Sequence, residues 1–244
     1  MSNSRVHHSI VRQDLQLNKL LYYALLLAAL NFLAISFLPT IPMRSIRLLT
    51  TVFFLTYYSF FIVGRNRYVL AILLLLLVRD VFYVFYWQGN AAYYFFLFSI
   101  LSYGVLLLKQ WRRLAKIEFI SPSLVVGVLL AMAFIYLITC LKDIIAPGLE
   151  STGVLLIFYV FGSFIVVTLL SALYYYYRVG SRRSICFGFL VLNLMVADVA
   201  FTVAYYTASY NMYYLERLTY IGALVLLLHY GLNTKLLNRE LQNS

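Results

Sequence analysis

Eight apolar runs constrain this sequence more than any other feature, and several reach the roughly 20 residues that a bilayer core demands. Lipid offers no hydrogen-bond partners, so a segment that crosses it must pair its own backbone groups, as a helix does. Only 11% of the residues are charged, whereas soluble domains carry about 25%. The predicted fold class is all-α, a polytopic membrane protein with about eight transmembrane helices. The predicted spans cover residues 20–38, 48–63, 68–87, 92–108, 120–141, 153–177, 185–207 and 213–232.

The Lys and Arg residues outside these runs gather on one side of the predicted membrane. Fourteen lie in the two tails and in the links after the second, fourth and sixth runs, against three in the other links. Basic residues favour the cytoplasmic side, so both termini are expected there. The net charge of +11 then reflects topology and contact with anionic headgroups at the cytoplasmic face, and no nucleic-acid partner is expected. The expected location is the bacterial inner (cytoplasmic) membrane.

Two carboxylates in apolar surroundings mark an internal repeat. Asp80 and Asp198 are 118 residues apart, and Tyr103 and Tyr220 are 117 apart, so one register relates both pairs with a single-residue slip. The whole chain, 1–244, is therefore predicted to be one membrane domain. It would hold parallel four-helix repeats at about 20–108 and about 120–232, joined by a cytoplasmic hinge at 109–119. Parallel repeats bring equivalent positions to equal depth, so the two Asp residues are expected to face a shared cavity.

Other charged residues near the predicted span ends admit plainer interpretations. Arg44 and Arg47 are expected to extend to lipid headgroups, and Glu216 and Arg217 are expected to form a solvated pair at the outer interface. A charged side chain within a span is costly, so each Asp is predicted either to line a polar cavity or to hydrogen-bond a neighbouring helix. For Asp80 the expected ionic partner is Arg217 or the adjacent Arg79.

Motifs in four of the runs give a family resemblance. Asp80, Tyr103, Asp198 and the segment 219–223, Thr-Tyr-Ile-Gly-Ala, are similar to motifs of the YhhN-like integral membrane proteins. That family has eight helices, and its animal members include lysoplasmalogenases. The sequence departs from the family pattern at four places. They are Ile100 in place of a His, Leu224 in place of a Gln, Arg79 in place of a small residue, and Arg47-Leu48 in place of Lys-Pro.

The resemblance implies a hydrolase that cleaves the vinyl ether bond of a lysolipid within the membrane, without a metal or other cofactor. Asp80 and Asp198 would be the catalytic pair, one protonated as the acid and the other ionised to stabilise an oxocarbenium ion. A non-catalytic protein that binds or senses a lipid or another apolar ligand is the alternative, and a transporter is a further one. The oligomeric state stays open. The predicted substrate-binding residues are Tyr103, Arg217, Thr219 and Tyr220.

Overall fold

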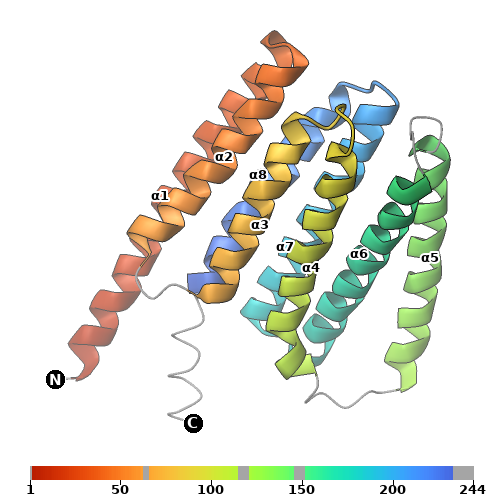
Figure 1. The fold of residues 1–244 in the computed structure, drawn as a ribbon. Helices are drawn as coiled ribbons and strands as arrows, with labels where there is room; N and C mark the ends of the chain where they lie inside the picture. The colour runs from red at the N-terminus through yellow and green to blue at the C-terminus, as the bar shows by residue number, and fades with distance from the viewer. Residues whose placement is uncertain (1, 63–65, 115–120, 146–151, 233–244) are drawn as a thin grey trace.

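The computed structural model describes residues 2–62, 66–114, 121–145 and 152–232. These residues form eight α-helices and no strand, which confirms the all-α prediction. Successive helices run in opposite directions through one bundle (Figure 1). The helices are α1 (Ser2–Phe37), α2 (Thr40–Phe61), α3 (Arg67–Val84), α4 (Ala91–Leu114), α5 (Ser121–Ile145), α6 (Thr152–Val179), α7 (Arg182–Tyr206) and α8 (Asn211–Leu232).

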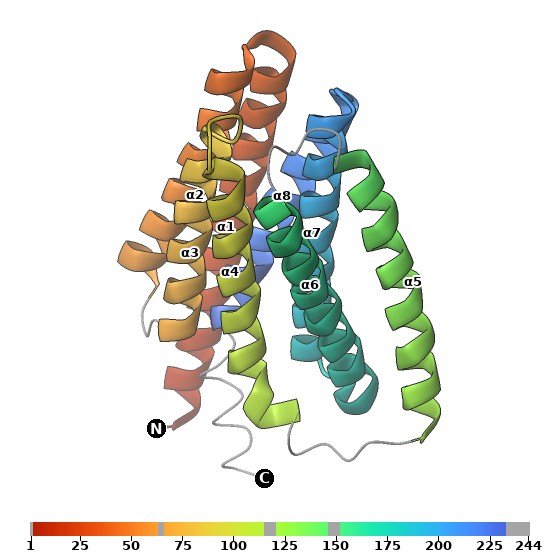
Figure 2. The same ribbon diagram turned by 45° about the vertical axis from the view of Figure 1, so that its right-hand side comes forward.

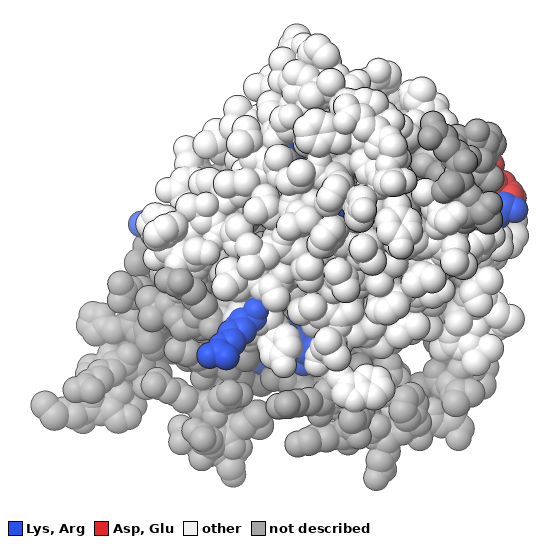
Figure 3. Space-filling view, in the orientation of Figure 1, with Lys and Arg blue, Asp and Glu red and all other residues white. Residues whose placement is uncertain are grey.

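Five of these helices are long and apolar enough to cross a membrane: α1, α4, α5, α6 and α7. The other three, α2, α3 and α8, carry most of the charged side chains that lie inside the bundle. The face drawn in Figure 3 is almost uncharged through its middle, and its blue side chains lie toward the lower part and the edges. The helices and this surface agree with a protein that resides in a membrane.

The interior of the bundle lies where α3, α7 and α8 meet. Helix α7 packs along α8, while α3 packs between α2 and α4, and α4 also packs against α6. Helix α5 stands at the edge of the bundle, where it packs against α6 and α7 (Figure 2). The turns α1–α2, α3–α4 and α7–α8 lie at one end, at the top of Figure 1. This end is called the turn end below.

Helix α2 begins eight residues before the predicted span at 48–63. Pro39 occupies its N-cap position with φ −59°, and Pro42 lies in its first turn, where a missing N–H leaves no helical bond unmade. Because the helix starts early, Arg44 and Arg47 face the bundle interior and are 2% and 1% exposed, so the prediction that they extend to headgroups is wrong.

Candidate functional site

Seven charged side chains lie inside the bundle with at most 2% of their surface exposed. We call them the charged cluster. Burying an ion is costly unless an opposite charge and hydrogen bonds accompany it, so the pairing within the cluster determines what each group can do. The members are Arg44 and Arg47 on α2, Arg79 and Asp80 on α3, Asp198 on α7, and Glu216 and Arg217 on α8.

Asp80 is held by groups from two other helices, α2 and α8. Arg47 Nη2 lies 3.1 Å from Asp80 Oδ1. Tyr220 and Thr51 donate hydrogen bonds of 2.6 and 2.5 Å to Oδ2. The main ionic partner of Asp80 is thus Arg47 rather than Arg217, and the adjacent Arg79 makes only a 3.6 Å contact through Nε. Neighbouring residues on a helix point about 100° apart, which explains why the adjacent guanidinium is the lesser partner.

Asp198 has a guanidinium and a phenol as its partners. Arg79 Nη1 donates to Oδ1 at 3.0 Å, and the Tyr103 hydroxyl donates to Oδ2 at 2.8 Å. Because Arg79 also contacts Asp80, its guanidinium lies between the two carboxylates. The expected open cavity shared by both Asp residues is therefore replaced, in the part of the chain described, by a bridging cation.

The two carboxylates accept from tyrosines in a reciprocal pattern. Asp80 on α3 accepts from Tyr220 on α8, and Asp198 on α7 accepts from Tyr103 on α4. Each bond therefore joins an Asp of one chain half to a Tyr of the other half. The structure thus brings together four residues that sequence motifs singled out as site candidates.

Glu216 is buried, so the prediction of a solvated pair with Arg217 is wrong. Its carboxylate accepts from Arg47 on one oxygen and from Arg217 on the other. Arg217 also donates to the Tyr83 hydroxyl at 3.2 Å and to the Met43 carbonyl at 3.4 Å. A carboxylate that accepts from two guanidinium groups offsets part of the cost of burying them, which explains why neither Glu216 nor Arg217 reaches solvent.

Two further residues show what sequence motifs found and missed. Thr219, a predicted binding residue, is half-buried and donates to the Leu215 carbonyl of its own helix at 2.8 Å, so it lies outside the charged cluster. Thr51 was missed, although its hydroxyl contacts both Asp80 and Tyr220. Thr51 follows Arg47 by four residues, so both lie on one helix face. This spacing is the sequence feature that could have identified Thr51.

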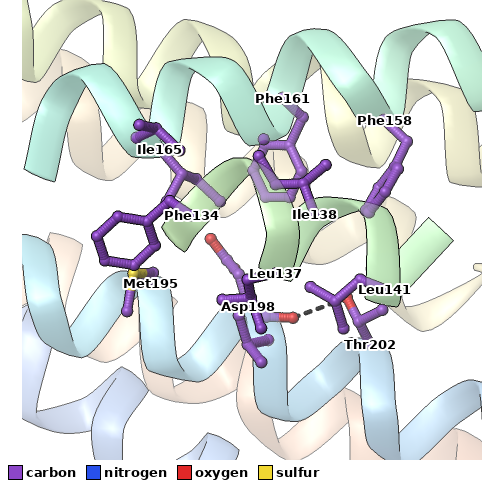
Figure 4. A pocket seen from close by; sticks show the side chains of 13 residues that line it. Phe134, Leu137, Ile138, Leu141, Phe158, Phe161, Ile165, Met195, Asp198 and Thr202 are labelled. Atoms are coloured by element: carbon purple, nitrogen blue, oxygen red, sulfur yellow. Dashed lines mark hydrogen bonds between the residues drawn. The ribbon is translucent and has the colours of Figure 1, made fainter. Parts of the chain in front are cut away.

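An apolar groove adjoins Asp198. It lies between α5, α6 and α7, and Asp198 is the one charged residue that lines it (Figure 4). Thr202, one turn along α7, also lines it and donates to the Asp198 backbone carbonyl at 2.8 Å. Asp80 does not line it. The apolar lining is formed by Phe134, Leu137, Ile138 and Leu141 of α5, Phe158, Phe161, Gly162, Ile165 and Val166 of α6, and Met195 and Val199 of α7.

An apolar lining with one placed polar group is a common feature of ligand sites. Within the described residues, no three His, Cys, Asp or Glu side chains come together as a metal site would require.

No family model, no curated protein and no solved structure matches this chain. The resemblance to the YhhN-like family therefore rests on the quoted motifs alone.

Proposed function

We propose that this protein binds a single-chain amphiphile, such as a lysolipid, inside the membrane. The apolar chain would lie in the groove between α5, α6 and α7, with a polar group of the ligand beside Asp198. The observation that carries the proposal is that one buried carboxylate faces an otherwise apolar groove. An ionisable group in lipid is expensive, and such groups commonly mark a site.

Helix α5 would be the way in for the ligand. Only 11% of its candidate span is buried, the lowest share among the five apolar helices. Gly162 of α6 lets Ile138 of α5 approach closely, since a Cβ added at that glycine would lie 2.8 Å from Ile138 Cδ1. In lipid, helices associate through such small-residue packing and not through a hydrophobic drive. Apart from this close contact at Gly162, most of the α5 span is not buried, so an alkyl chain from the bilayer would enter beside it.

The membrane arrangement is part of the same proposal. We infer eight spans in parallel repeats at about 20–108 and about 120–232, with both termini and the hinge 109–119 in the cytoplasm of a bacterial cell. The reciprocal Asp–Tyr bonds support the repeat. So does the packing of α2 on α3 and α3 on α4, which parallels that of α6 on α7 and α7 on α8. Residues 115–119 of the hinge lie outside the described residues.

Hydrolysis of a vinyl ether is the second candidate, favoured by the Asp198–Tyr103 pair at the groove. A proton added to the outer vinyl carbon gives an oxocarbenium ion, water adds to that ion, and the hemiacetal releases the aldehyde and the glycerol hydroxyl. A carboxylate stabilises the cation and orients the water. Asp198 already accepts from Arg79 and Tyr103, and Asp80 does not line the groove, so the second carboxylate that the mechanism uses is not at the groove. Binding therefore ranks first.

Titration of the purified protein with lysophosphatidylcholine tests the binding proposal. A ligand that binds only the folded state raises the unfolding temperature, and the rise increases with the ratio of free ligand concentration to Kd. Val199→Phe, which adds a ring to the groove wall, should reduce this rise. Val167→Phe on the exposed face of α6 makes the same change outside the groove and should leave it intact. An equal response in both variants would refute the assignment of the groove.

The same protein incubated with a lysoplasmalogen separates the two candidates. Intact ligand recovered from the complex supports binding. Release of the aldehyde by wild type and its loss in Asp198→Asn supports hydrolysis.

A further inference from the structure

Arg44 differs from every other arginine of the charged cluster because it has no carboxylate partner among the residues that the structure describes. Arg47, Arg79 and Arg217 each pair with Asp80, Asp198 or Glu216. The cluster therefore holds four guanidinium groups and three carboxylates, and Arg44 carries the unbalanced charge. Its Nε and Nη1 atoms make no hydrogen bond with the residues that the structure describes, although the side chain is 2% exposed. An unpaired buried ion of this kind calls for a counter-ion.

Aromatic rings surround this guanidinium. Its Cζ atom lies 5.1 Å from the ring centre of Tyr205 and 5.4 Å from those of Tyr83 and Trp87. The Tyr213 hydroxyl lies close enough to Arg44 to interact with its charge. Ring faces stabilise a cation only partly, and they cannot satisfy planar N–H donors as an oxyanion does. The rings therefore hold Arg44 in place while leaving its donors for another group.

The position of Arg44 makes it reachable from one end of the bundle. It lies at the start of the second turn of α2, and helix side chains lean toward their N-terminus, here the turn end. Tyr205 is in the last turn of α7 and Tyr213 in the first turn of α8. Trp87 lies beyond the end of α3, in the turn before α4, and is 42% exposed. One wall of the Arg44 surroundings is thus an exposed side chain on a turn.

The helix terminus adds to the local positive potential. The first turn of α2 has no acidic residue, and its N-cap residue Pro39 makes no side-chain cap. The N-terminal end of a helix attracts anions through its free N–H groups and its dipole. Together with a guanidinium that lacks a carboxylate, this favours an anion with several acceptor oxygens.

We propose that Arg44 binds a phosphate group at the turn end, between Trp87, Tyr205 and Tyr213. Guanidinium pairs with phosphate through parallel N–H···O bonds, and the aromatic rings exclude water from the pair. The phosphate belongs either to a lipid headgroup or to free phosphate. The site shares no residue with the lining of the groove, so it stands whether or not the groove binds an amphiphile.

Trp87 provides the test, because its ring lies against Arg44. The chain has two Trp residues, and Trp111→Phe leaves Trp87 as the only emitter. In this background, protein in a neutral maltoside detergent is titrated with dodecyl phosphate and, separately, with inorganic phosphate. A saturable change in Trp87 fluorescence with dodecyl phosphate alone identifies a site for a lipid headgroup. An equal fluorescence change with both probes identifies a site for free phosphate. No saturable change with either probe would overturn the proposal.

Substitutions then assign the response to Arg44. Arg44→Gln should weaken binding at least about tenfold, as expected for losing a charge-assisted bidentate pair. Arg44→Lys, which keeps the charge but not the planar donors, should weaken it less. The control is Arg178→Gln, an exposed arginine in the last turn of α6, which should bind as wild type does. Equal affinity in Arg44→Gln and wild type would refute the site.

A stability readout distinguishes a ligand site from a structural role. Arg44→Gln removes an unpaired buried charge, so it should maintain or raise the unfolding temperature without ligand. Arg47→Gln removes the partner of two carboxylates and should lower it. If Arg44→Gln destabilised the protein as Arg47→Gln does, Arg44 would be a structural group and the proposal would fail.

Discussion

Replacing Asp80 with Asn tests whether the charged cluster stabilises the bundle through ion pairing. The carboxylate accepts from Tyr220 and Thr51 on one oxygen and pairs with Arg47 at 3.1 Å on the other. The amide keeps the shape but loses the charge, and one of its two polar atoms can no longer accept a bond. The substitution should therefore destabilise the fold strongly without changing the volume of the core.

The magnitude follows from the partners that remain. Breaking a buried ion pair costs about 3–5 kcal/mol, because one charge is left uncompensated. Arg47 keeps its second partner, Glu216, which puts the expected loss near the lower bound, about 3 kcal/mol. For chains of 150–250 residues each kcal/mol shifts the unfolding temperature by about 2–4 °C, so Asp80→Asn should lower it by about 6–12 °C.

The chain contains a natural reporter for this measurement. Cys186 on α7 is buried, and Cys140 on α5 is exposed. In a Cys140→Ser background, a dye that becomes fluorescent on reaction with thiols labels Cys186 when the bundle unfolds. The unfolding temperature of purified wild type and Asp80→Asn is then read from the labelling curve.

The matched control is a pair of similar length at the surface. Lys142 Nζ and Asp143 Oδ1 are 2.9 Å apart, but their side chains are 36% and 72% exposed. Asp143→Asn should leave the unfolding temperature unchanged, because solvent screens exposed pairs. If Asp80→Asn produced as small a shift as Asp143→Asn, the claim that buried pairing stabilises this bundle would be wrong.

Three further predictions use the same labelling assay. Glu216→Gln leaves Arg217 without its carboxylate partner, while Arg47 keeps Asp80, and should cost about 3–5 kcal/mol; a neutral result would contradict the pairing scheme. Tyr103→Phe deletes one bond to a carboxylate and should cost about 1.5–3 kcal/mol, and a neutral result would show that the bond contributes nothing. Gly162→Ala forces a contact with Ile138 and should lower the unfolding temperature relative to Gly188→Ala, whose added Cβ meets open space; equal values would argue against tight packing of α5 on α6.

Sequence patterns predicted the helices well, because a backbone in lipid must form its hydrogen bonds within its own segment, as a helix does. All eight predicted runs correspond to observed helices, and the main error concerns where α2 begins. Two prolines near the start of a helix resemble a turn when read in sequence, but both fit the cap and first turn. This error mattered because it put Arg44 and Arg47 outside the bundle.

The pairing within the site was less predictable. Asp80, Asp198 and their two tyrosines stood out through the repeat, and the structure joins them in bonds between chain halves. The pair between Arg47 and Glu216 joins residues 169 positions apart, and no local pattern relates them. A charged residue near a span end is normally solvated, and only its distant partners decide that it is buried.

Photolabelling of the groove is the measurement that tests the central claim most directly. Lysophosphatidylcholine with a diazirine near the end of its chain is irradiated with the purified protein, and the labelled peptides are identified by mass spectrometry. The account predicts labels on groove residues such as Phe134 and Met195, which excess unlabelled lysolipid abolishes. Labels confined to outward-facing residues such as Leu156, and unaffected by competitor, would contradict the proposal that this groove binds an amphiphile.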